Sequence, residues 1–263
     1  MDSPIVGIIL ALVMILLGNT LEGGHIGSIV GGPAAMIVIG GTIGAVLVQV
    51  PMSVFLAACK AAAASFGKPK EDPSKILEEL VDYANRARRD GVLALEKVAE
   101  AAPDPFMRKA LMMAVDGADA TTLKETMELA IGQEEEHGED QAKAFEAAGG
   151  YAPTIGIIGA VLGLIHVMSN LSDINAVGSG IAAAFVATIY GVASANILFL
   201  PIAARIKLGV RGRVQMREMI LTGVLAIQSG MNPKLVRERL SEYIHGGHGA
   251  KGGAGAGAPA AAS

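Results

Sequence analysis

Two stretches of this sequence, residues 151–168 and 178–204, carry prolines and a mid-stretch hydroxyl but no Asp, Glu, Lys or Arg. Pro153 and Pro201 have no backbone N–H, so each leaves a helix carbonyl that water or an ion could use. Thr188 adds a hydroxyl oxygen in the middle of the second stretch. These residue types suit the lining of an ion path. The structural alternatives stay open, because a proline also kinks or starts a helix and a threonine hydroxyl also bonds the carbonyl four residues before it.

An acid is missing from this set. Proteins that couple ion flow to work usually keep a titratable carboxylate inside the bilayer. The apolar windows of this chain contain no Asp or Glu, and His166 is their one side chain that titrates near neutral pH. If the protein moves ions, a partner helix must therefore supply the carboxylate.

A second candidate site is the group of charges around Gly91, in which Arg88 and Glu96 stand on either side of the glycine. A solvated charged surface is the ordinary interpretation, because isolated surface ion pairs contribute little to stability. The sharper interpretation is a charged patch that binds a partner protein.

The elements that must position these residues are membrane helices. Four windows free of charge are long enough to cross roughly 30 Å of hydrocarbon as helices, and they cover residues 3–21, 31–58, 151–168 and 178–204. The first is not typical of a secretory signal peptide, because no basic segment precedes it and a second window follows at once. The sequence predicts an all-α integral membrane protein with four transmembrane helices.

The distribution of Lys and Arg predicts the orientation. Residues 60–150 hold 12 of these cations and residues 202–263 hold 9, which accounts for all 21 in the chain. Cytoplasmic segments carry the excess of Lys and Arg in membrane proteins. We therefore expect both charged regions and both termini to be cytoplasmic, and the basic residues that follow the last span, beginning with Arg205, to lie near anionic lipid headgroups.

Helical periodicity and capping residues predict a compact helical subdomain between spans two and three. A helix with apolar residues at positions 76–77, 80–81 and 84 is expected to end near Asp90 with Gly91 as the cap, and further helices are expected over residues 92–102 and 105–115. A capping box of Thr121 or Thr122 with Glu125 is expected to open a long helix towards Gly149.

The predicted division of the chain follows the spans. Spans one and two lie in residues 1–59, span two covering residues 33–55, and a cytoplasmic loop covers residues 60–150. Spans three and four lie in residues 151–204, basic C-terminal helices in 205–245, and a Gly/Ala-rich disordered tail in 246–263.

The sequence contains no recognisable enzyme chemistry. It has no phosphate-binding loop, no paired-histidine metal motif and no arrangement of a nucleophile with His and an acid. We expect no enzymatic activity, no cofactor, no metal site and no nucleic-acid partner.

Three segments, GGYAPTIGIIGAVLGLIHVM, AFVATIYGVASANILFLPIA and GVLAIQSGMNP, together resemble the A subunit of the bacterial flagellar stator, the MotA/PomA type. The resemblance covers nearly the whole chain, including the large loop after span two and the basic C-terminal region. It implies a pentamer around a dimer of a MotB-type B subunit, whose single span carries the ion-binding Asp.

The resemblance also implies roles for individual residues. Arg88 and Glu96 match the residues of this family that contact the rotor protein FliG and generate torque. Pro153 and Pro201 match its two functional prolines, and Thr188 its path-lining threonine. Ala160 stands where sodium-driven relatives have a second threonine, so H⁺ is the expected ion and Na⁺ the less favoured one.

Two alternatives remain at this stage. An ExbB/TolQ-like subunit that energises outer-membrane processes would belong to the same superfamily, but those relatives usually have three spans and an external N-terminus. A structural membrane scaffold that conducts nothing would also suit the many small residues in the spans.

Overall fold

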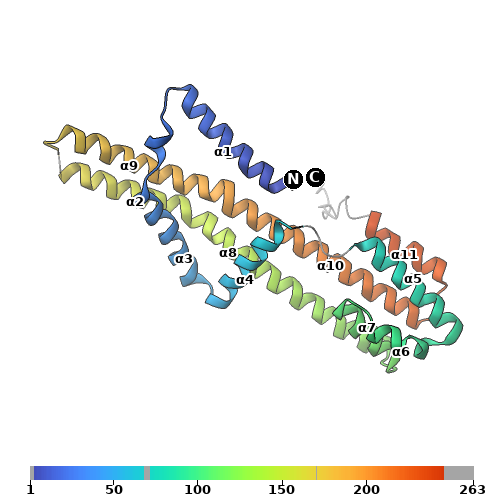
Figure 1. The fold of residues 1–263 in the computed structure, drawn as a ribbon. Helices are drawn as coiled ribbons and strands as arrows, with labels where there is room; N and C mark the ends of the chain where they lie inside the picture. Colours follow the sequence, from blue (N-terminus) through green and yellow to red (C-terminus); the bar gives the residue numbers. More distant parts are fainter. Residues whose placement is uncertain (1–2, 68–71, 170, 246–263) are drawn as a thin grey trace, which may run out of the picture. The chain divides into compact units, whose positions relative to one another are not determined.

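The computed structural model describes residues 3–67, 72–169 and 171–245 of the chain. Almost all of these residues are helical and none lies in a strand (Figure 1). Four helical segments are long and apolar enough to cross a membrane: Pro4–Leu21, Ile26–Gln49, Ala120–Ser169 and Ile174–Gln228. The prediction of an all-α membrane protein with four spans is therefore confirmed. The predicted disordered tail, residues 246–263, lies outside the described residues.

The chain forms two compact units. The membrane unit contains residues 1–68 and 133–212, and the loop unit contains residues 69–132 and 213–263. The predicted boundaries at residues 150 and 204 fall inside the helices α8 (Ala120–Ser169) and α10 (Leu200–Gln228), so no helix ends there. Each unit is assembled from two separate stretches of sequence because these two long helices contribute to both.

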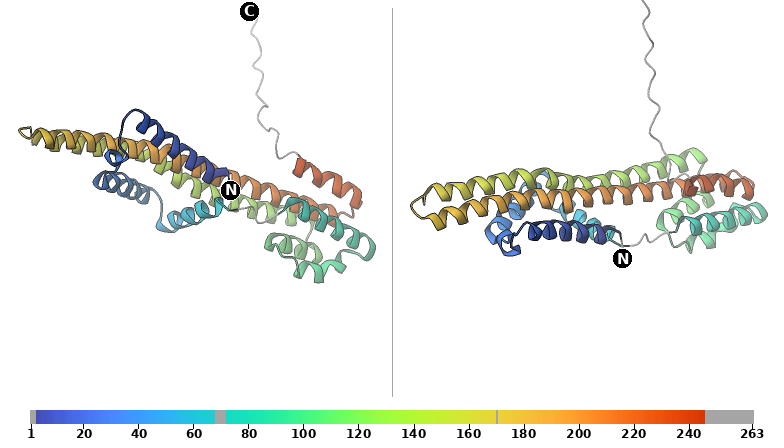
Figure 2. Two further views of the ribbon diagram at one scale, coloured as in Figure 1. Left: turned by 45° about the horizontal axis from the view of Figure 1, so that its top comes forward. Right: turned by 90° about the horizontal axis from the view of Figure 1, so that it is seen from above.

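The membrane unit is organised by an antiparallel pair of helices, α8 and α9 (Ile174–Ala193), which lie side by side in both views of Figure 2. Asp173 caps α9, its carboxylate accepting from the backbone N–H groups of Asn175 and Ala176. A π-helical turn, η4 (Ser194–Phe199), joins α9 to α10 without a break. The N-terminal helix α1 (Ser3–Leu21) is followed by the short helix η1 (Ile26–Ile29).

Small residues let α8 and α9 approach closely. A Cβ built on Gly191 would lie 2.6 Å from the carbonyl oxygen of Ala152, and one built on Gly156 would lie 2.9 Å from that of Ala187. Real Cβ atoms do not come this close, so glycine is required at both positions. Apolar helices in lipid associate through such contacts, because burial of apolar surface gives no advantage there.

The second span ends earlier than predicted. It consists of α2 (Gly32–Ala35), the π-helical segment η2 (Met36–Gly40) and α3 (Gly41–Gln49). The predicted end at residue 55 is wrong, because the residue before a proline avoids helical backbone angles. Val50, which precedes Pro51, is extended with φ −123° and ψ 146°, and a separate helix α4 (Met52–Ser65) follows.

One prediction about α8 is also wrong. The helix is capped by Asp119 and not by a threonine: its carboxylate accepts from the N–H groups of Thr121 and Thr122 and from the Thr122 hydroxyl. These bonds lower the pKa of Asp119, with the hydroxyl as the largest cause. Of the structural alternatives for Pro153, a helix start does not apply, because α8 continues through the proline for 16 further residues to Ser169.

The loop unit has a core of large apolar side chains. It contains α5 (Pro73–Asp90), η3 (Val92–Leu95), α6 (Glu96–Glu100), α7 (Pro105–Val115) and α11 (Pro233–His245), together with the adjoining ends of α8 and α10. Leu80, Met107 and Ile220 are fully buried in this core. The predicted helix that ends near Asp90 and the predicted helix over residues 105–115 are confirmed, as is the cap at Gly91, which has φ +84°. The stretch expected to be one helix over residues 92–102 is a 3-10 turn followed by α6, which ends at Glu100.

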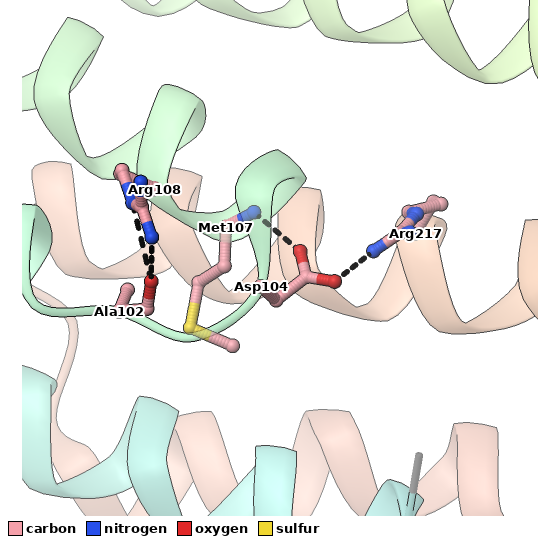
Figure 3. Close-up of polar contacts among 5 residues, drawn as sticks. All are labelled: Ala102, Asp104, Met107, Arg108 and Arg217. Atoms are coloured by element: carbon pink, nitrogen blue, oxygen red, sulfur yellow. Dashed lines mark hydrogen bonds and ion pairs between the residues drawn. The ribbon is translucent and has the colours of Figure 1, made fainter. Parts of the chain in front are cut away.

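A buried ion pair fixes α7 on α10 within the loop unit (Figure 3). Asp104 caps α7 by accepting from the Met107 N–H at 2.7 Å, and its second oxygen binds Arg217. The two side chains are only 7% and 13% exposed, and the Arg217 guanidinium also lies 5.2 Å from the centre of the Phe106 ring. The pair therefore ties the segment that follows α6 to the helix that continues from the fourth span.

Replacing Arg217 with Met is expected to leave the Asp104 carboxylate buried without its cation, at a cost of about 3–5 kcal/mol in stability. A double change, Asp104→Ser with Arg217→Met, should recover much of this loss, because serine keeps the helix cap and carries no charge. Hydrogen exchange of the α7 amides in the full-length protein measures both effects. Equal destabilisation by the single and double variants would argue against the ion pair.

Gly191→Ala is expected to force α8 and α9 apart and to lower stability by about 1–3 kcal/mol. Gly178 is the matched control, because it lies on the same helix and a Cβ there would meet no atom within 4 Å. Thermal unfolding of the purified protein in detergent compares the two variants. A Gly191→Ala protein as stable as Gly178→Ala would contradict the packing described here.

Candidate functional site

The contact between α8 and α9 brings Pro153, Ala160 and Thr188 into one stretch of the membrane unit. The Cα of Pro153 lies 3.2 Å from the position that a Cβ on Gly191 would occupy. A Cβ on Gly159 would lie 2.9 Å from the Ala187 side chain, so these two residues are in contact. Ala160 is the next residue after Gly159, and Thr188 is the next residue after Ala187. Ala160 and Thr188 are both partly exposed in the single chain, which leaves their side chains accessible from beside the helix pair.

The surroundings of Pro153 and Pro201 meet at one contact, that of Gly149 with Leu200. In an α-helix the N–H of residue 153 would bond the carbonyl of residue 149, and proline cannot make this bond. A Cβ on Gly149 would lie 2.5 Å from the Leu200 side chain, so Gly149 packs against the residue that precedes Pro201. The backbone that Pro153 leaves unbonded therefore lies beside the start of α10.

Pro201 follows a stretch of altered hydrogen bonding. Leu200 donates to the carbonyl of Ala195, five residues earlier, as in a π-helix. Pro201 donates to no carbonyl at all, because it has no N–H. Departures from α-helical bonding of this kind are frequent at functional sites.

The Thr188 hydroxyl donates to the Ala184 carbonyl at 3.2 Å. The ordinary helix bond considered for this threonine is therefore present. It uses the hydroxyl proton but leaves the oxygen able to accept a hydrogen bond from water or a partner. Self-bonding and the lining of a polar path are compatible at this residue.

Sequence reasoning missed Tyr190, which stands two residues beyond Thr188. Its hydroxyl accepts from the Gly31 N–H at 3.1 Å and donates to the Ile29 carbonyl at 2.9 Å. The connection between α1 and α2 is thereby attached to α9 close to the candidate path. A tyrosine within an apolar span is the one signal in the sequence, because its hydroxyl must find a partner there.

The charge-free part of the helix pair, residues 151–168 of α8 together with α9, offers oxygen atoms but no acid. Its candidate ligands are backbone carbonyls and the Thr188 hydroxyl, and the charge-free windows supply no carboxylate. Within the described ranges no cluster of three or more His, Cys, Asp or Glu side chains could hold a metal ion. The charge-free stretches therefore present a polar wall of oxygen atoms without a carboxylate.

Arg88 and Glu96 form an exposed charged surface on the loop unit. Arg88 lies in the last turn of α5 and Glu96 starts α6, and the turn at Gly91 separates them. Both are exposed, and neither makes an ion pair with another described residue. The neighbouring Arg89 pairs with Asp90 at 2.9 Å and lowers the pKa of that carboxyl. The charges of Arg88 and Glu96 are thus available to a partner protein.

Two family profiles together cover most of the chain. Residues 98–219 match the MotA/TolQ/ExbB proton channel family, and residues 5–91 match the N-terminal domain of motility protein A. Motility protein A of Bacillus subtilis is 35% identical, over 92% of this chain and 90% of its own length.

Solved structures agree with these matches. The structure of C. jejuni MotAB contains a chain with a TM-score of 0.88 and 31% identity, covering 92% of this chain and 96% of its own. The flagellar MotAB stator complex from Bacillus subtilis gives a TM-score of 0.86 and 33% identity, with 93% and 96% covered. The chain therefore belongs to the motility protein A family of flagellar stator subunits, within the MotA/TolQ/ExbB proton channel family.

Proposed function

We propose that this stator subunit conducts protons together with a MotB-type B subunit and converts their flow into torque on the flagellar rotor. The observation that carries the proposal is the charge-free part of the α8–α9 pair, residues 151–168 and 178–193, which provides hydroxyl and carbonyl oxygens but no carboxylate. A proton path across a bilayer needs a titratable group at depth. In this proposal the Asp in the single span of the B subunit supplies it.

The assembly is proposed to be a pentamer around a dimer of the B subunit. Support comes from the similar solved structures, which are MotAB complexes. The exposed apolar side chains of α8 and α9, such as Ile158, Ile165 and Phe185, are available to neighbouring subunits or lipid. In a single chain without neighbouring subunits or lipid, these apolar side chains remain exposed.

Four apolar helices and the family make the chain a multi-pass protein of the bacterial inner membrane. We place both termini and the loop unit in the cytoplasm, on the strength of the Lys and Arg distribution. This orientation would present the loop unit to the rotor. The proposal assigns the chain no enzymatic reaction and no cofactor.

Pro153 and Pro201 are proposed to couple ion passage to movement of the helices. Both interrupt the hydrogen bonding of long helices that contribute to the membrane unit and the loop unit. A helix bends most easily where a hydrogen bond is missing. A change of charge beside Thr188 could thus alter the direction of α8 and α10.

The proposed ion is H⁺ because Ala160 supplies no oxygen where a sodium-driven relative has threonine. Na⁺ needs several oxygen ligands at once, whereas a proton needs one acceptor at a time. We expect swimming speed to be unchanged when Na⁺ is replaced by K⁺ at constant proton-motive force, and to be lost when a protonophore is added. The measurement uses a deletion strain that expresses this chain with its B subunit. Loss of swimming on Na⁺ removal alone would assign the stator to sodium.

Reversing Arg88 or Glu96, by Arg88→Glu or Glu96→Arg, is expected to abolish or strongly slow swimming. The reason is that like charges brought together at an interface cost several kcal/mol. Proton flux through the assembled complex should persist, because both residues belong to the loop unit and not to the charge-free stretches of the spans. The control is Lys109→Glu, which reverses another exposed cation of the loop unit. Full torque in both Arg88 and Glu96 reversals would exclude these residues from the rotor contact.

A further inference from the structure

An apolar cleft of about 280 Å³ lies within the membrane unit, between α1 and the helical run from η4 to α10. Its walls include Gly7, Ile8 and Ala11 on one side and Ile197 and Ile202 on the other. These residues belong to the first and fourth candidate membrane spans. The cleft is therefore at the depth of the bilayer, where hydrocarbon and not water surrounds the protein.

The helix α1 leaves this cleft open. None of its membrane window is buried inside the chain, in contrast to 33% of the window in the fourth span. A gap with mostly apolar walls offers water few hydrogen bonds, whereas a lipid chain can fill it with van der Waals contacts.

One charged side chain lines the cleft, that of Arg205. Its Nε donates to the carbonyl of Ser65, the last residue of α4. Its two terminal amino groups make no hydrogen bond or ion pair with any described residue. A guanidinium with a free pair of N–H groups suits a phosphate, which it binds through two parallel hydrogen bonds.

The other polar group of the cleft is already satisfied. The Asn196 amide nitrogen donates to the Val192 carbonyl at 2.9 Å, within its own helix. The cleft therefore presents one cation at an apolar wall, which is the pattern that an anionic phospholipid matches with its phosphate and its acyl chain. A zwitterionic lipid fits less well, because its ammonium group is repelled by Arg205.

We propose that this cleft binds an anionic phospholipid, with one acyl chain between α1 and η4–α10 and the phosphate on Arg205. The lipid would fill the space beside Pro201, which also lines the cleft. This inference does not depend on which ion the stator conducts, since it rests on the membrane unit alone.

The chain offers a pair of variants that separate the cleft from the rest of α1. Gly7 lines the cleft and Gly18 does not, and at both positions a Cβ would meet no atom within 4 Å. Gly7→Leu should therefore extend a side chain into the cleft from a position where the Cβ has room, and Gly18→Leu adds the same side chain elsewhere on the same helix. For the charge, Arg205→Gln is matched by Arg211→Gln, which removes an exposed cation that does not line the cleft.

The test uses the assembled complex with its B subunit in nanodiscs. A phosphatidylglycerol probe with a photoreactive diazirine on one acyl chain is cross-linked and mapped by mass spectrometry. Labelling is expected on Ile8, Ala11, Ile197 and Ile202, and Arg205→Gln should lower it about tenfold, the effect of losing a charge-assisted hydrogen bond. Gly7→Leu should lower it at least as far, while Gly18→Leu and Arg211→Gln should retain it. A phosphatidylcholine probe should label the cleft more weakly.

Labelling of the cleft that is equal in all variants, or absent from the wild-type complex, would overturn the proposal. Cross-links that show a neighbouring subunit seated in the cleft would also overturn it. Gly7→Leu keeps Arg205 and its bond to α4, so the test stands even where Arg205→Gln fails to assemble. A negative result leaves proton conduction and rotor contact untouched, because labelling requires neither.

Discussion

The close approach of α8 and α9 is the interaction on which the membrane unit depends. Two apolar helices in lipid gain little from burying apolar surface, so contact between their backbones must hold them together. Gly156 and Gly191 allow this contact, because each faces a carbonyl oxygen at a distance that excludes a Cβ. The same contact sets Pro153 opposite α9 near Thr188. A wall of carbonyl and hydroxyl oxygens is thus a by-product of the packing that stabilises the pair.

The buried residues of α8 change in kind along the helix. In the loop unit they are large, and Leu123 and Met127 are fully buried in a core driven by the hydrophobic effect. In the charge-free stretch of the helix, residues 151–168, most of them are small, and Ala152, Gly156 and Gly159 are buried there. One continuous helix therefore follows two packing rules, one suited to water and one to lipid. Its glycines and alanines are concentrated where the second rule applies.

Local patterns in the sequence predicted what local interactions determine. Charge-free windows predicted the four spans, and Gly91 and Pro105 marked helix ends because backbone angles there depend on the residue itself. The resemblance to flagellar stator subunits is confirmed by the family matches. The cap of α8 was assigned to a threonine because several neighbouring side chains can serve, and geometry selects Asp119. The second span was extended too far because its apolar composition continues past Pro51.

Long-range contacts could not be predicted in the same way. The bond of Tyr190 to Gly31 joins residues 159 positions apart, and the Asp104–Arg217 pair joins residues 113 apart. Nothing in the local pattern of either residue names its partner. The roles of Arg88, Glu96, Pro153, Ala160, Thr188 and Pro201 stay predictions, although their geometry is consistent with those roles. Arg205 was predicted only as one of several basic residues near headgroups, because a cleft exists only in three dimensions.

The π-helical turn η4 has a consequence for how relatives of different length compare. It holds one residue more than an α-helical turn, and one residue advances the face of an α-helix by about 100°. A one-residue deletion in the α-helical turns of α9, before η4, would rotate the helix that follows. Leu200 would then turn away from Gly149 and Val210 away from Gly138, the residues that they now contact. A deletion within Ser194–Phe199 can instead be absorbed by converting the π-turn to an α-turn. Sequence alignments across this segment should therefore place a one-residue gap here in preference to any other position of the helix.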